Sequence, residues 1–204
     1  MRTSRFLSLS FLASVAAAIA MAPGAQAADD YFLRIEGVAG ETPAGKVTDA
    51  IQIKSFEWGT ENPVTIGSMT GGAGTGKATF GDLKIEKNID STSPQLFQKL
   101  GQGAVIPSME LVARRAGTPN PAAGIYMRYC FAPVFVAAQT QQGAGGNDTS
   151  TETVTFKFGA AQQTYTRQSP SGQPLGNVFA SWNMTTNSPA MTIAGSNPCS
   201  SSRF

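Results

Sequence analysis

The sequence predicts a mainly β fold, an antiparallel barrel or sandwich, and three observations lead to this prediction. The 204-residue chain contains 22 glycines and 12 prolines, and only 14% of its residues are charged. Short segments with alternating apolar and polar residues recur along it, separated by clusters of turn residues. Only one segment has the pattern of a good helix. A series of about eight short strands is typical of antiparallel barrels and sandwiches, and a hydrophobic content of 41% is enough for a buried core.

The strands expected in the first half of the chain include one with an irregular pattern. Its apolar residues occupy odd positions at Ile51 and Ile53 and then even positions at Phe56 and Trp58. Because successive side chains of a strand point to opposite faces, this switch predicts a bulge near Lys54 and Ser55. The expected strands are residues 31–38, 51–58 and 82–87, with loops over 41–49 and 62–76.

A single helix is expected over Ser93 to Leu100. Ser93 suits the N-cap, Pro94 the first helical position and Gly101 the stop. The spacing of the apolar residues places three of them on one face, namely Leu96, Phe97 and Leu100.

The second half of the chain predicts four further strands and a tail. The segment 125–136 is apolar on both faces, which favours a central buried strand, but Pro133 requires an edge or a bulge. The remaining strands are expected over 109–113, 154–158 and around 182–185, with a hairpin loop over 139–151 and a loose, flexible tail over 188–204.

Residues 1–27 have the layout of a secretory signal peptide. Arg2 and Arg5 are followed by an uncharged apolar stretch, and Ala25-Gln26-Ala27 is a small-x-small cleavage site. The alternative is an uncleaved membrane anchor, but the stretch is barely long enough to span and Pro23-Gly24 interrupts it. We therefore expect export to the periplasm or the medium, with no membrane attachment after cleavage.

The composition excludes several classes of function. The chain has no histidine, so it has neither a Ser-His-Asp triad nor a histidine metal site, and two cysteines cannot form a four-cysteine zinc site. Residues 28–204 contain thirteen basic and thirteen acidic residues, and Arg114-Arg115 is their only adjacent basic pair. A neutral chain of this kind has no electrostatic footprint for nucleic acid. We expect no enzyme activity, no metal and no cofactor.

Residues 71–77, GGAGTGK, nearly match the phosphate-binding P-loop pattern. The match fails because Ala78 stands where a magnesium-binding hydroxyl is required, and the residues that follow favour a strand and not a helix. A flexible loop between strands is the preferred interpretation.

Cys130 lies in an apolar strand and Cys199 in the tail. In an exported chain the two residues can form a disulfide that fastens the tail to the barrel. The alternative is a buried free thiol and an exposed one, and spacing alone does not choose between them.

Phe56 and Trp58 flank Glu57 on one expected strand. The two aromatic side chains should point into the core, which leaves Glu57 facing solvent, a partner or a pore.

The ordered segments of the chain resemble the haemolysin-coregulated protein (Hcp) family, the tube protein of bacterial type VI secretion. The resemblance runs from about Asp30 to Asn187 and depends on the order of its segments more than on any one motif. The segments are YFLRIEGVAGE (31–41), SFEWG (55–59), GTGK (74–77), DLKIEKNIDSTSPQLFQKLGQG (82–103), ELVARRAG (110–117), YMRYCFAPVFVAAQTQQGAGG (126–146), ETVTFKFG (152–159) and SWN (181–183).

This resemblance implies a barrel of two antiparallel sheets with one short α-helix on its side, formed by residues 28–187. It also implies that six copies close into a ring, that rings stack into a tube, and that some rings carry small effector proteins. Glu57 would then face the lumen. The glycine loop, with Gly67, Gly71, Gly72, Gly74 and Gly76, would be an arm that contacts the next ring.

The expected signal peptide leaves two functions open, because tube proteins of the family usually lack one. The first is an exported, ring-forming structural or carrier protein without catalysis. The second is a monomeric periplasmic or secreted barrel that serves as a binding module and has lost the tube role.

Overall fold

The computed structural model describes residues 29–42, 47, 49–65, 74–75, 77–116, 124–143, 145–146, 149–169, 173–191, 199 and 204. The expected signal peptide, residues 1–27, lies outside the described residues. Within them the chain forms twelve strands and one helix, and every strand pairing is antiparallel. The expectation of a mainly β fold with one helix is therefore confirmed.

The main sheet closes into a barrel because its two end strands are consecutive in the chain. The strand order is β2-β1-β9-β10-β11-β8-β3, with β12 added to β11. Only Lys54 separates β2 from β3, so the two ends of the order meet. The strands are β1 (Asp29–Ile35), β2 (Ile51–Ile53), β3 (Ser55–Glu57), β8 (Leu83–Asn88), β9 (Met109–Arg115), β10 (Ile125–Gln142), β11 (Thr151–Gln168) and β12 (Pro174–Asn183).

The expected bulge near Lys54 and Ser55 is a change of partner strand. β2 pairs with β1, whereas β3 pairs with β8. The Lys54 N–H already donates to the Glu86 carbonyl (2.7 Å), so the chain crosses from one part of the sheet to the other at that residue. The switch in apolar positions thus marks the closure point of the barrel.

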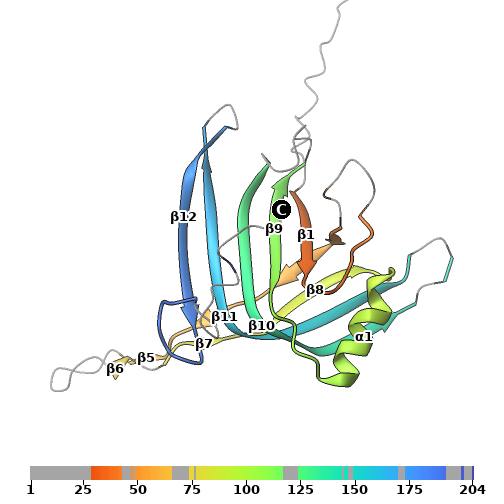
Figure 1. Cartoon of the computed structure of the whole chain (residues 1–204), viewed down its shortest axis with the longest axis horizontal. Coiled ribbons are helices and arrows are strands. Elements are labelled where there is room, and N and C mark those ends of the chain that lie inside the picture. The colour runs from red at the N-terminus through yellow and green to blue at the C-terminus, as the bar shows by residue number, and fades with distance from the viewer. Residues whose placement is uncertain are drawn as a thin grey trace, which may run out of the picture.

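The long strands β10 and β11 bend and divide the barrel into two sheets, or layers (Figure 1). One layer contains β1, β2, β9 and β12, and the other contains β3 and β8. β9 pairs with β10 only as far as Phe131, so Pro133 has no partner residue in β9. A proline fits at this position because it has no N–H to donate to a neighbouring strand. Both strands are longer than expected, because the hairpin loop covers only residues 143–150.

Helix α1 (Thr92–Gln102) lies on the side of the barrel against β10, but its ends differ from the prediction (Figure 1). Ser93 is not the cap: it is inside the helix and buried. The N-cap position is Ser91, whose side chain makes no capping bond, and Asp90, one residue earlier, accepts the Thr92 N–H with its Oδ1 (2.8 Å) instead. The helix passes through Gly101 and ends at Gly103, whose φ of 58° is the left-handed conformation that glycine adopts readily.

The core fills the barrel between its layers. Aromatic residues from several strands meet there, with ring centroids 5.5 Å apart for Trp58 and Phe131 and 4.6 Å apart for Phe131 and Phe158. Each large apolar side chain that is fully buried contributes roughly 1.5–3 kcal/mol. The fully buried core residues include Leu33, Leu83, Leu96, Ile106, Met109, Leu111, Phe131, Val134, Val154 and Phe156.

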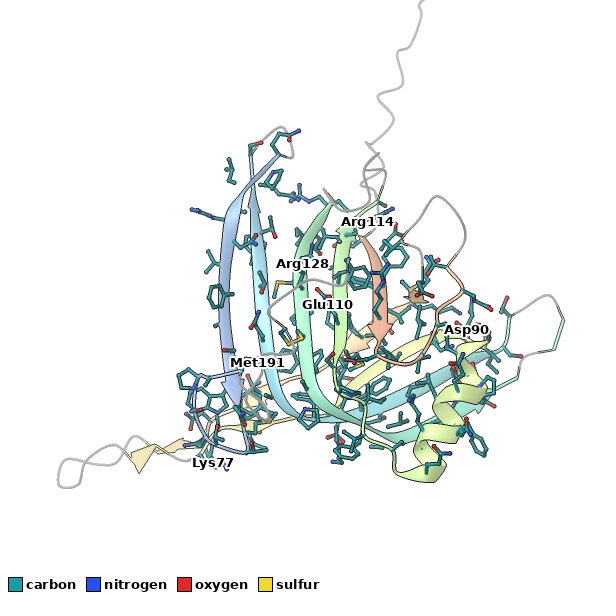
Figure 2. The ribbon with its side chains drawn as sticks, in the orientation of Figure 1. Lys77, Asp90, Glu110, Arg114, Arg128 and Met191 are labelled. Carbon is teal, nitrogen blue, oxygen red and sulfur yellow. A yellow bond between two sulfur atoms is a disulfide. The ribbon has the colours of Figure 1, made fainter. Side chains whose placement is uncertain are left out.

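The described residues of the expected tail lie against the barrel. Cys130 and Cys199 form a disulfide with their Cα atoms 5.9 Å apart. Met191 is buried against Ala132 and Ala160 (Figure 2). The Phe204 ring packs on a second apolar cluster on the outer face of β1 and β9.

Candidate functional site

The outer face of β3 and β8 carries exposed charges of both signs. Glu57 is exposed and pairs in register with Lys84, while Phe56, its neighbour, pairs with Ile85 and points inward. Along the same face the Lys157 ammonium contacts Asp82 at 3.0 Å. The exposed charged residues of this face, the mixed-charge face, are Glu57, Lys84, Glu86 and Lys157.

Aromatic packing sets the direction in which Glu57 points. Phe56 meets Tyr31 and Tyr129 at centroid distances of 5.3 and 5.5 Å, and Trp58 meets Tyr129 at 5.8 Å. The expectation that both aromatics belong to the core is confirmed. Because alternate residues of a strand point to opposite faces, Glu57 must then face outward.

The glycine-rich loop begins as a two-stranded arm. β4 (Thr60–Glu61) pairs with β7 (Thr79–Phe80), and β5 (Val64–Thr65) pairs with β6 (Gly74–Thr75). This arm projects away from the barrel (Figure 1). At its base the Lys77 ammonium donates to the Met184 carbonyl at 3.4 Å. Gly74 lies in β6, whereas Gly67, Gly71, Gly72 and Gly76 lie outside the described residues.

A buried ion pair under the start of α1 was not foreseen from the sequence. The side chains of Lys87 and Glu152 are both fully buried, with Nζ 2.8 Å from Oε1. Lys87 also contacts Asp90 Oδ1 at 2.6 Å, and the Ser93 hydroxyl donates to Glu152 Oε1 at 2.7 Å. Lys87 continues the alternation of Leu83 and Ile85 along β8, so it lies on the inward face of the strand. This position in the alternation is the sequence signal from which a buried lysine could have been predicted.

This pair anchors α1 to the barrel. The Gln139 amide donates to Glu152 Oε2 at 2.6 Å and also to the Ser93 carbonyl at 3.2 Å, so strand and helix share one network. Burial raises the pKa of Glu152, but hydrogen bonds from Lys87, Ser93, Gln139 and Gln141 outweigh it and hold the pKa below its usual range. The buried charges of Lys87 and Glu152 are thus paired with each other and hydrogen-bonded, as charges inside a protein require.

Two further ion pairs lie on the outer face of β9 and β10. Arg114 contacts Asp30 at 3.1 Å and Arg128 contacts Glu110 at 3.2 Å (Figure 2). Among the described residues, no group of three or more histidine, cysteine, aspartate or glutamate side chains could hold a metal ion. In the same residues no helix has the length and apolar character needed to cross a membrane.

The closed antiparallel barrel, its side helix and its projecting arm define the fold of this protein, and comparison with known proteins specifies the family. Residues 32–165 match the family model described as "Type VI secretion system effector, Hcp". The chain is 32% identical over 112 residues to Protein hcp1 of Pseudomonas aeruginosa, which covers 54% of this chain and 68% of the relative. The chain belongs to the Hcp family.

Solved structures agree with this assignment. The chain is similar to a type six secretion system protein with a TM-score of 0.72 and 29% identity, covering 79% of this chain and 99% of the other. It is also similar to Hcp1 from Salmonella typhimurium, with a TM-score of 0.63 and 29% identity, covering 78% of this chain and 97% of the other. The resemblance inferred from the ordered segments is therefore confirmed.

Proposed function

We propose that this protein is an exported, ring-forming structural or carrier protein, in which six copies surround a central channel and no reaction is catalysed. The observation that carries the proposal is the family match over residues 32–165, which spans most of the barrel. A neutral mature chain suits this role, because copies that pack side by side in a ring must not repel one another.

The mixed-charge face is the proposed wall of the channel. Glu57, Lys84, Glu86 and Lys157 are exposed on it and alternate in sign. A wall with both signs of charge fits small folded effector proteins, whose surfaces also carry both signs, better than nucleic acid, which requires a basic surface.

The projecting arm is the proposed contact between stacked rings. β5 and β6 hold its stem as a hairpin, and the arm extends beyond the barrel (Figure 1). Replacing residues 66–73 with an Asn-Gly turn would keep the β5–β6 stem and remove the tip. We expect this variant to form single rings in electron micrographs, and stacking as in the natural chain would contradict the role of the arm.

Export by residues 1–27 agrees with the disulfide between Cys130 and Cys199, because disulfides persist mainly in oxidising compartments. The intact mass of the protein recovered from the periplasm or the medium tests this step. Cleavage after Ala27 should leave a chain that begins at Ala28. A cytoplasmic protein that retains Met1 and reduced cysteines would overturn it.

The solution mass of the purified protein, by size-exclusion chromatography with light scattering, tests the ring. A mass of six subunits supports it. A monomer at all concentrations, with and without reductant, would overturn it and favour a monomeric binding barrel. The attachment of the tail residues Met191, Cys199 and Phe204 to the outside of the barrel is the observation that favours this second function.

A further inference from the structure

The inner face of the sheet continues beyond the part of the barrel that the second layer covers. Cross-strand partners share a face, so the register places one row of side chains across five strands. In this row Tyr165 opposes Val178, and the two side chains are 46% and 58% exposed. The row consists of Tyr31, Ala113, Met127, Tyr165 and Val178, and leads from the core to the edge of the sheet.

Strand β12 lies at that edge, and the devices that usually protect an edge strand, Pro174 and a bulge between Arg167 and Gln168, are confined to its first residues; from Asn177 to Trp182 it has neither a charge nor a proline nor a bulge. Its ten residues, PLGNVFASWN, contain no charge, and it pairs with β11 alone among the named strands. Leu175 and Phe179 are 60% and 70% exposed. Soluble proteins guard long edge strands with lysines, bulges or a covering segment, so an uncharged and apolar edge indicates a surface that a partner covers.

A second exposed apolar surface lies at the α1 end of the barrel. Phe97 is 67% exposed on α1, and Val105, just after the helix, is 56% exposed. The bridge between Ile106 and Val134 brings Val105 beside Phe135, which is also exposed. Figure 1 shows β12 and α1 on opposite sides of the molecule.

We infer that the β11–β12 hairpin of one copy packs on the α1 end of the next copy, as the contact that joins subunits. This inference rests on the proposed ring and identifies its two contact surfaces. Two different surfaces on opposite sides of one chain cannot form a two-fold contact with themselves, but they can form a head-to-tail contact that closes into a ring.

Area and charge both favour a second copy as the occupant. Tyr165 and Val178 expose apolar surface on one face of the hairpin, and Phe179, which pairs with Thr164, exposes it on the other face. A partner that wraps around the β12 edge would cover on the order of 400 Å² of these side chains together with Leu175. That is about the apolar share of the roughly 800 Å² that each partner buries in a stable interface. From Ala160 to Asn183 the only charged residue is Arg167, so association removes few charges from water.

The test uses one charge on each surface. Val178→Glu places a charge on the hairpin row, and Phe97→Glu places one on the α1 end. Both positions are more than half exposed, so both variants should fold with the circular dichroism spectrum of the natural protein. We expect each variant alone to lose the multi-subunit mass and run as a monomer. The matched controls Asn177→Asp and Gln98→Glu add a charge at an exposed neighbouring position and should keep the mass of the natural protein.

Mixing the two variants gives the decisive measurement. The α1 end of the Val178→Glu chain and the hairpin of the Phe97→Glu chain are both intact, so the mixture should form a species of two subunits that neither variant forms alone. Native mass spectrometry of a mixture with one isotope-labelled variant would identify it as a mixed pair.

The other outcomes separate this inference from the proposed function. If the natural protein is a monomer, the ring proposal fails and the inference fails with it. If the natural protein is an oligomer and either variant remains one, or if either control also dissociates, the two surfaces are wrong although a ring exists. If both variants dissociate but their mixture stays monomeric, the contact is not head-to-tail between these surfaces.

Discussion

Replacing Lys87 with methionine should destabilise the barrel far more than replacing Lys84, three residues earlier on β8. The Lys87 side chain is fully buried beside the carboxylate of Glu152, whereas Lys84 points to solvent on the mixed-charge face. Methionine keeps much of the volume of lysine in both cases. The difference in stability between the two variants therefore measures the contribution of the buried Lys87 ammonium.

The expected cost follows from the geometry of the pair. At 2.8 Å the attraction between the two charges is about 6 kcal/mol if the effective dielectric constant is about 20. Removing one partner of a buried pair costs about 3–5 kcal/mol, because the other charge remains buried. Hydrogen bonds from Ser93, Gln139 and Gln141 still solvate Glu152, so we expect about 3 kcal/mol for Lys87→Met. For Lys84→Met we expect less than about 0.5 kcal/mol.

The assay is urea unfolding of the disulfide-intact protein at one fixed protein concentration, followed by tryptophan fluorescence. The double variant Lys87→Met, Glu152→Gln should be more stable than Lys87→Met alone, since it removes the unpaired charge. The cost of Lys87→Met should also shrink as the pH falls from 7 to about 4, because without the ammonium the buried carboxyl binds a proton more readily. Equal costs for the Lys87 and Lys84 variants, or a double variant less stable than Lys87→Met, would refute the reasoning.

Three further outcomes can be measured on the same protein. Glu152 has a lowered pKa in the folded state, so its contribution to stability is present above the ordinary value of about 4.3 and is lost as the pH falls through the lower folded value. Glu152→Gln should therefore flatten the fall in Tm on acidification, and an unchanged fall would contradict this role. The Cys130–Cys199 disulfide closes a loop with a sequence separation of 69, so Cys199→Ser should lower the free energy of unfolding by about 4 kcal/mol in the chain-entropy model. A decrease below about 1 kcal/mol would mean that fastening the tail adds little to the stability of the fold. A Cβ added to Gly159 would lie 2.9 Å from the Pro133 ring, while one added to Gly145 meets nothing within 4 Å. Gly159→Ala should therefore lower the free energy of unfolding in urea by about 1–3 kcal/mol, and an effect no larger than that of Gly145→Ala would show that the Pro133 ring moves aside freely.

Local sequence pattern predicted the elements whose two faces differ. In β8 the buried residues Leu83, Ile85 and Lys87 alternate with exposed ones, and the apolar members of that series located the strand. Phe56 and Trp58 were assigned to the core for the same reason. By contrast, residues 174–180 of β12 lack such a pattern because both faces of the strand are exposed there, and only its end near Trp182 was foreseen.

Details that depend on distant residues were not predictable in this way. Serine is a common N-cap residue, but the Ser93 hydroxyl donates its hydrogen bond to Glu152, which is 59 residues away in the sequence. Ser93 is therefore part of the buried network and not the cap of the helix. The helix start therefore moves toward Asp90. The parity switch at Lys54 was seen correctly, but a bulge and a change of partner strand produce the same local pattern.

The sequence by itself determined the fold class, the position of the helix, the aromatic core around Trp58 and membership of the Hcp family, because each depends on side-chain periodicity or on the order of segments. Only the tertiary structure decided how β2 and β3 close the barrel, that Lys87 meets Glu152, that Cys130 meets Cys199, and that Val178 and Phe97 face solvent on opposite sides. These features join residues that are far apart in the chain, and their contacts form only when antiparallel pairing brings the strands into register.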